Sequence, residues 1–151
     1  MNPAVSSPDT SFTCQAMDKL EWMVAIDIFE TETSTFWKRP GANPQDNNTE
    51  VFLLPAASSL EKEGSVTSSA RWMQWRYKVI NPPGEAREDL WITNRLMLKL
   101  KELYENEGGP NAEAITELDW DYGDTPDVHR VAREINGYDL NTGKLVANLT
   151  K

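Results

Sequence analysis

Two short apolar runs, at residues 22–28 and 51–54, most strongly constrain what this chain can fold into. Asp27 lies near the end of the first run, and Pro55 stops the second. Runs of this length are typical of strands that are buried on both faces of a parallel sheet. We therefore expect an α/β fold, with a short and mostly parallel sheet flanked by helices.

The helices of this fold are predicted from apolar spacing and from capping residues. Segment 11–20 follows a cap at Asp9 or Thr10, and segment 85–107 gives the strongest helical pattern of the chain. We expect two further short helices over 111–118 and 126–136. The residues expected to be buried in the two main helices are Phe12, Ala16, Leu20, Ile92, Leu96, Leu100 and Leu103.

The remaining segments have weaker patterns. Residues 56–63 predict one or two helical turns that end at Gly64. Residues 71–80 are rich in aromatic and branched side chains and favour a third strand or an extended arm. The tail from Asn141 onward is polar, and we expect it to be loose.

Composition excludes several classes of function. The chain has one cysteine, Cys14, so it cannot ligate an iron–sulfur cluster or form an internal disulfide. Its only histidine, His129, is interpreted as a surface or packing residue, and no pair of residues is typical of a nucleophile and its base. The acids between residues 113 and 127 do not match a calcium loop. We therefore expect no metal site and no catalytic group.

The net charge of −9 is unevenly distributed. Residues 71–101 form a basic island with seven basic and three acidic side chains, whereas the segments before and after it are acidic. Such an island indicates either a surface for phosphates or an ordinary solvated face. The acidic chain as a whole is not expected to bind nucleic acid. No apolar run is long enough to span a bilayer, so we expect no insertion into a membrane.

Three charged residues are candidates for binding a nucleotide. Asp27 ends the first predicted strand, where an acid can accept hydrogen bonds from a ribose or can cap the next turn. Asp89 opens the long helix, where it can pair with the guanine edge or can simply complement the helix dipole. Lys62 follows the second strand and can meet a phosphate or form a surface salt bridge. Spacing alone favours the structural role at each position.

Several stretches, taken together, resemble one protein family. They are residues 2–8, Asp-Ile-Phe-Glu-Thr-Glu-Thr at 27–33 with Phe-Trp at 36–37, Leu-Pro-Ala-Ala at 54–57 with Glu-Lys-Glu-Gly at 61–64, residues 74–78 and 82–87, Asp-Leu-Trp at 89–91, and Glu-Ile-Asn-Gly-Tyr at 134–138. In this order they resemble the large (alpha) subunit of molybdenum- or tungsten-dependent formate dehydrogenases, within the wider molybdopterin oxidoreductases. The resemblance covers nearly the whole chain.

The resemblance implies a role for each candidate. In the family, this stretch lies in an α/β domain that holds one of two molybdopterin guanine dinucleotides, shared with the rest of the subunit. By resemblance, Asp27 serves a ribose or guanine group, Lys62 a phosphate and Asp89 the guanine edge, while Asn2 matches an asparagine of the family's Gly-Xaa-Asn-Pro turn. Residues 1–107 would bind this cofactor, and residues 108–151 would form an acidic helical extension with a loose tail.

The departures from the family are equally informative. Its subunit is several times longer, and the cysteines for a [4Fe–4S] cluster and the catalytic cysteine or selenocysteine have no counterpart here. The strand before Asn2 is also missing, which predicts an exposed sheet edge. After Thr67, the family's asparagine and glycine are replaced by Ser68 and Ala70.

These observations predict a cofactor-binding segment of a formate dehydrogenase large subunit, with no chemistry of its own. Its partners would be the remaining parts of that subunit and the iron–sulfur subunit. With no export signal in the chain, it would reach the periplasm only with an exported partner and would otherwise stay in the cytoplasm. The alternatives are a non-enzymatic interaction or cofactor-handling domain and a non-functional gene remnant.

Overall fold

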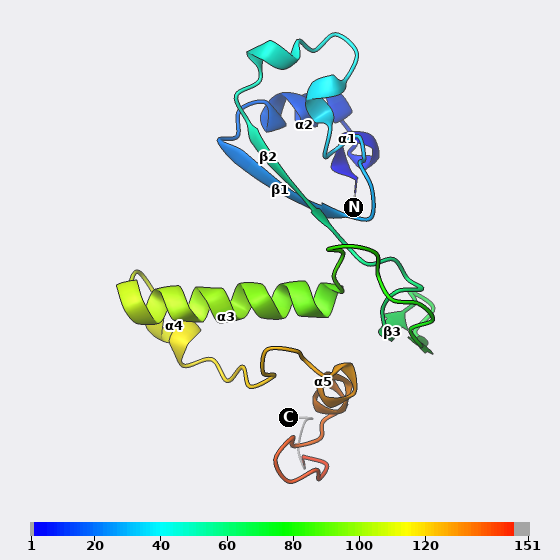
Figure 1. Cartoon of the computed structure of the whole chain (residues 1–151), viewed down its shortest axis with the longest axis vertical. Coiled ribbons are helices and arrows are strands. Elements are labelled where there is room, and N and C mark those ends of the chain that lie inside the picture. Colours follow the sequence, from blue (N-terminus) through cyan, green and yellow to red (C-terminus); the bar gives the residue numbers. More distant parts are fainter. Residues whose placement is uncertain (1, 147–151) are drawn as a thin grey trace. The chain divides into compact units, whose positions relative to one another are not determined.

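The computed structural model describes residues 2–146 (Figure 1). The chain divides into two compact units. The first unit comprises Met1–Ala57 and Pro83–Ala86, and the second comprises Ser58–Pro82 and Arg87–Lys151. The division into a cofactor-binding segment 1–107 and an extension 108–151 is a functional one, and it stays a prediction.

The first unit is built on two parallel strands, as the apolar runs predict. Strand β1 (Trp22–Asp27) pairs with β2 (Glu50–Pro55), in a register that places Trp22 opposite Glu50 and Asp27 opposite Pro55. Helices α1 (Pro3–Ser6) and α2 (Thr10–Met17) precede β1, and short 3₁₀ helices lie at Phe36–Lys38 and Pro44–Asp46. The Asp9 carboxylate accepts the N–H of Phe12 at 2.8 Å, which confirms the predicted cap of α2.

The core of the first unit is a small cluster beneath α2. Cys14, Met17 and Phe36 are buried there, and partly buried side chains of the two strands pack against them. The predicted buried stripe of this helix is wrong, because Phe12 is 69% exposed. Helix α2 instead turns the face with Cys14 and Met17 toward Phe36. Phe36 lies in a later 3₁₀ helix, and the spacing of residues in α2 cannot reveal its position.

The prediction that both strands are buried on both faces is also wrong. Side chains along β1 alternate between exposed and half-buried, and Trp22, Val24 and Ile26 are exposed. Within the described residues this sheet has two strands. Met23 of β1 and Val51 of β2 pack against the core cluster, and they lie on the sheet face opposite to Trp22 and Val24. The other face therefore remains open to solvent.

The second unit begins with a hairpin that the sequence did not predict in full. Strand β3 (Gly64–Thr67) pairs antiparallel with β4 (Met73–Arg76). Strand β4 confirms the extended structure expected within 71–80. The helical turns expected over 56–63 are wrong: the Glu61 carboxylate accepts the N–H of Ser58 at 2.8 Å, which closes a turn, and Gly64 starts a strand. The described residues thus hold one parallel and one antiparallel pair of strands in an α/β fold.

Three helices complete the second unit, close to their predicted positions. They are α3 (Asp89–Glu107), α4 (Ala112–Thr116) and α5 (Val128–Ile135), and Figure 1 shows α4 close to the C-terminal end of α3. The predicted buried stripe of α3 is wrong, since Leu96 and Leu103 are exposed. The side chain that α3 buries completely is that of Asn94, at 0% exposure.

Hydrogen bonds explain the burial of a polar side chain at this place. Asn94 Nδ2 donates to the carbonyl of Gly123 at 2.8 Å, and its Oδ1 accepts the indole N–H of Trp120 at 2.8 Å. The segment 120–123 therefore covers this face of α3. A buried amide is tolerated because both of its ends are paired.

Backbone hydrogen bonds close a turn near the end of the described chain, and the prediction of a loose tail from Asn141 stays a prediction. The N–H of Asp139 donates to the carbonyl of Lys144 at 2.8 Å, and Tyr138 forms an isolated bridge with Leu145. Residues 147–151, on which the prediction of a loose tail also falls, lie outside the described residues. Among residues 2–146, no helix combines the length and the apolar character needed to cross a membrane.

Candidate cofactor site

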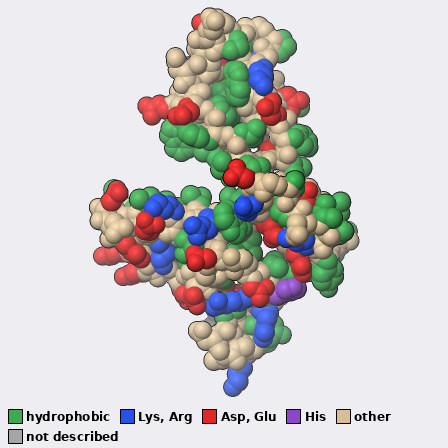
Figure 2. All heavy atoms as spheres, in the orientation of Figure 1, with side chains coloured by type: hydrophobic (Ala, Val, Ile, Leu, Met, Phe, Trp, Pro, Cys, Tyr) green, Lys and Arg blue, Asp and Glu red, His purple; other side chains and the backbone are tan. Residues whose placement is uncertain are grey.

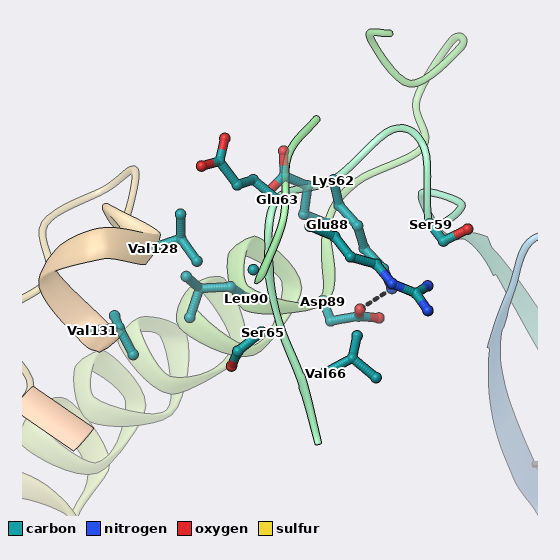
Figure 3. A pocket seen from close by; sticks show the side chains of 12 residues that line it. Ser59, Lys62, Glu63, Ser65, Val66, Glu88, Asp89, Leu90, Val128 and Val131 are labelled. Atoms are coloured by element: carbon teal, nitrogen blue, oxygen red, sulfur yellow. Dashed lines mark hydrogen bonds and ion pairs between the residues drawn. The ribbon is translucent and has the colours of Figure 1, made fainter. Parts of the chain in front are cut away.

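A cavity of about 420 Å³ lies in the second unit, between the β3–β4 hairpin, the start of α3 and helix α5 (Figure 3). Its apolar wall is formed by Leu90 of α3 together with Val128 and Val131 of α5. The opposite wall is charged and contains Lys62, Arg76, Glu88 and Asp89. One end of the cavity can therefore pack against a flat apolar group while the other presents both signs of charge.

Lys62 and Asp89 form an ion pair on the charged wall, and Figure 3 shows their side chains facing each other. The structure thus brings together two of the candidates that the sequence placed 27 positions apart. The Asp89 side chain is 68% exposed and that of Lys62 is 33% exposed, so the carboxylate remains accessible. Solvent also screens such a pair, and we assign it little weight in stability.

Asp89 owes its position to the start of α3. It is the first residue of the helix, and the preceding residue, Glu88, accepts the N–H of Ile92 through its backbone carbonyl at 3.0 Å. The Glu88 side chain does not cap the helix but pairs with Lys78, whose Nζ lies 3.5 Å away. The carboxylate of Asp89 therefore lies at the positive end of the helix dipole, where a negative charge is stabilising.

Sequence reasoning missed a cluster at the edge of the same cavity. Glu63 accepts the indole N–H of Trp75 at 3.1 Å, and His129 Nε2 lies 3.0 Å from the same Glu63 oxygen. No spacing rule relates these three positions, which come from the residue before β3, from β4 and from α5. The only local signal was the place of Glu63 directly beside Lys62.

The other two candidates belong to the first unit, whereas every residue that lines the cavity belongs to the second. Asp27 is half-buried at the end of β1, and its carboxylate accepts the N–H of Ile28 at 2.9 Å. Asn2 is engaged at both ends of its amide: it donates to Glu32 at 2.6 Å and accepts from the Thr33 hydroxyl at 2.6 Å. The hydrogen bond from Asn2 is the main reason why the pKa of Glu32 is lowered.

The basic island of residues 71–101 is divided among several local contacts. Arg76 lines the cavity, while the guanidinium groups of Arg87 and Arg95 lie 5.5 and 5.9 Å from the ring centre of Trp91. Lys99 pairs with Glu102 farther along α3. On the face that Figure 2 shows, basic and acidic side chains lie among one another. Among residues 2–146, no group of three or more potential metal ligands comes together.

Comparison with known proteins identifies the sequence around this cavity. Residues 46–99, which include Lys62 and Asp89, match the model of the molybdopterin oxidoreductase family. The nitrate-inducible formate dehydrogenase major subunit of Escherichia coli K12 is 41% identical over 145 residues. The formate dehydrogenase alpha subunit of Megalodesulfovibrio gigas is 39% identical over 148 residues, and the formate dehydrogenase 2 alpha subunit (cytochrome c-553) of Nitratidesulfovibrio vulgaris is 41% identical over 138.

The chain is homologous to part of the formate dehydrogenase large subunit. The three alignments cover 91 to 95% of this chain, which confirms the resemblance drawn from its motifs. The homologous segment spans only 13 to 15% of the length of these relatives. The activity for which these relatives are named therefore belongs to proteins that are much longer than this chain.

Proposed function

We propose that this segment binds the guanine end of a molybdopterin guanine dinucleotide in an assembled formate dehydrogenase. The observation that carries the proposal is the Lys62–Asp89 pair on the charged wall of the cavity, inside the region that matches the molybdopterin oxidoreductases. The homology supports a cofactor of the molybdopterin type, and the chemistry of the cavity supports its guanine dinucleotide form.

The side chains of the cavity suit a guanine nucleotide. A carboxylate offers about four lone-pair sites, so Asp89 can keep its bond to Lys62 and still accept the two adjacent N–H groups of a guanine edge. Lys62 and Arg76 supply positive charge for phosphates. Leu90 and Val128 offer an apolar surface for the flat base.

Asp27 and Asn2 have different parts in this proposal. Asp27 lies at the carboxyl end of β1, the end of a parallel strand where ligands bind in open α/β sheets, and we assign it a ribose or guanine contact. Asn2 would act through the backbone that it orders, because both ends of its amide already bind Glu32 and Thr33. When bound, the cofactor supplies the molybdenum or tungsten centre for oxidation of formate to CO₂. This chain's residues bind and orient it and take no chemical step.

The proposed partners are the remaining parts of the large subunit and its iron–sulfur subunit. The exposed apolar side chains of β1 and β2 support this assignment, because an exposed apolar patch marks a surface that another protein covers. They are Trp22, Val24, Ile26, Phe52 and Leu54. The location would then follow the partner: periplasmic with an exported partner and cytoplasmic otherwise.

The test is calorimetric titration of the full chain with GDP as the probe. Replacing the carboxylate in Asp89→Asn leaves one acceptor and introduces a donor, and we expect affinity to fall about 10- to 100-fold, the cost of losing a hydrogen bond to a charged group. Lys62→Met should weaken GDP binding but leave guanosine, which has no phosphate, nearly unaffected.

Matched controls lie on the same helix. Lys99 and Glu102 form an ion pair in α3 and do not line the cavity, so Lys99→Met and Glu102→Gln should bind GDP like the parent chain. GDP binding that is equally strong in Asp89→Asn would contradict the assignment and would favour a protein-interaction domain.

A further inference from the structure

Side chains of β4 and α5 meet at one carboxylate oxygen of Glu63, the residue before β3. Trp75 of β4 donates its indole N–H to Glu63 Oε1 at 3.1 Å, and His129 Nε2 of α5 lies 3.0 Å from that atom. The indole and imidazole rings are also stacked, with centres 4.8 Å apart and planes inclined by 23°. The cluster therefore ties α5 to both strands of the hairpin.

The same contact forms part of the cavity wall. Glu63, which belongs to the cluster, lines the cavity. Val128, which precedes His129 in the sequence, lines it as well. Strand β3 approaches α5 so closely that a Cβ placed on Gly64 would meet Val128 Cγ2 at 3.5 Å. Any loosening of α5 from the hairpin thus changes the width of the cavity.

The strength of this contact depends on the proton of His129. A neutral imidazole presents either an N–H or a lone pair to the Glu63 oxygen, depending on its tautomer. An imidazolium always donates, adds a charge opposite to that of the carboxylate, and gains attraction to the face of Trp75. Protonation of His129 therefore changes how strongly the imidazole is held against Glu63 and Trp75.

The other charged groups around His129 balance one another. Asp127, Arg130, Arg133 and Asp139 line a hollow with it, which adds two acids and two bases. Hydrogen bonds from Thr142, first its backbone N–H and then its hydroxyl, hold the pKa of Asp139 below its ordinary value, so this carboxylate stays ionised over the relevant range. The charge of Glu63 therefore determines how this contact responds to protonation of His129.

We propose that Glu63, Trp75 and His129 form a clamp, closed when His129 is protonated, that holds α5 against the β3–β4 hairpin and sets the width of the cavity. We call these three residues the Glu63 clamp. The clamp needs no cofactor, so it stands independently of the function proposed above.

The test uses the fact that the chain contains one histidine. NMR of the full chain would follow the imidazole of His129, the indole N–H of Trp75 and the hydrogen-exchange protection factors of α5 amides between about pH 5.5 and 7.5. We expect the Trp75 signal to change together with the His129 signal, and α5 protection to be about two- to fivefold higher at the lower pH, the range for an exposed charged pair.

Conservative variants separate the clamp from mere packing. His129→Gln keeps a hydrogen-bond donor and Glu63→Gln keeps the shape, so both should fold but lose the pH dependence of Trp75 and of α5. Glu113→Gln, which changes an exposed glutamate of α4, should keep it. The clamp is refuted if the Trp75 signal is constant over this range, or if its pH dependence and that of α5 survive unchanged in Glu63→Gln and His129→Gln.

Discussion

The two units differ in the buried groups around which they pack. The first unit packs Cys14, Met17 and Phe36 under one helix and fixes its loops with polar contacts, such as the two-pronged pair of Arg39 with Asp18. The second unit places a hydrogen-bonded Asn94 at the centre of its packing and keeps an open cavity beside the start of α3. The first unit thus fixes its loops by polar contacts, whereas the second unit leaves a cavity accessible to a ligand.

This separation matters for the function that we propose. The candidates of the first unit already take part in local hydrogen bonds, whereas the Lys62–Asp89 pair of the second unit lies on a cavity wall. Six tryptophans report on the units separately, because Trp22 and Trp37 belong to the first and the other four to the second. Their indole N–H signals can therefore test each unit by itself.

The largest effect should come from the core of the first unit. Phe36 is 1% exposed, and Phe36→Ala removes the largest buried side chain, which should lower the free energy of unfolding by about 3–5 kcal/mol. We expect denaturant titration to show early loss of the Trp22 and Trp37 signals while those of the second unit persist. Simultaneous loss of all six would show that the units do not fold separately.

A slightly smaller effect should come from Asn94 in the second unit. Asn94→Ala leaves the half-buried Trp120 indole and the Gly123 carbonyl without their partner, and each lost hydrogen bond costs about 0.5–1.5 kcal/mol. We expect the second-unit tryptophan signals to melt first, which reverses the order seen with the Phe36 variant. As a control, Asn106→Ala removes an exposed asparagine of the same helix and should change little.

The smallest effect should be a pH dependence from Asp18. Its hydrogen bond with Arg39 lowers the folded-state pKa below the ordinary 3.8. The pair therefore stabilises the first unit at any pH well above 3.8, and this stability is lost as the pH falls through the lowered pKa. Asp18→Asn should cost about 1 kcal/mol at neutral pH. Thermal unfolding of both proteins should converge toward acid pH; a gap that stays constant would contradict the assignment.

Local sequence signals predicted much of the fold. The cap at Asp9, the two parallel strands and the positions of α3 and α5 follow from residues that are neighbours in sequence. Which face of each helix is buried did not follow. The buried face of α2 depends on Phe36, and that of α3 on Trp120, and both partners come from distant segments.

The candidate site was less predictable than the fold. The short strand β3 is largely polar, and its first residue, Gly64, is equally typical of a helix end, so the hairpin was missed. Lys62 and Asp89 became a set only through the family resemblance, because spacing alone favoured structural roles. Their ion pair and the contact of His129 with Glu63 join distant positions, which no helical or strand period encodes.

The central claim is that the carboxylate of Asp89 reads the edge of a guanine base. The most direct measurement compares binding of GDP with that of inosine diphosphate, which lacks the guanine amino group, by calorimetry on the parent chain and on Asp89→Asn. We predict that the parent chain binds GDP at least about tenfold more tightly than inosine diphosphate and that this preference disappears in the variant. Equal binding of the two nucleotides to the parent chain would contradict the account.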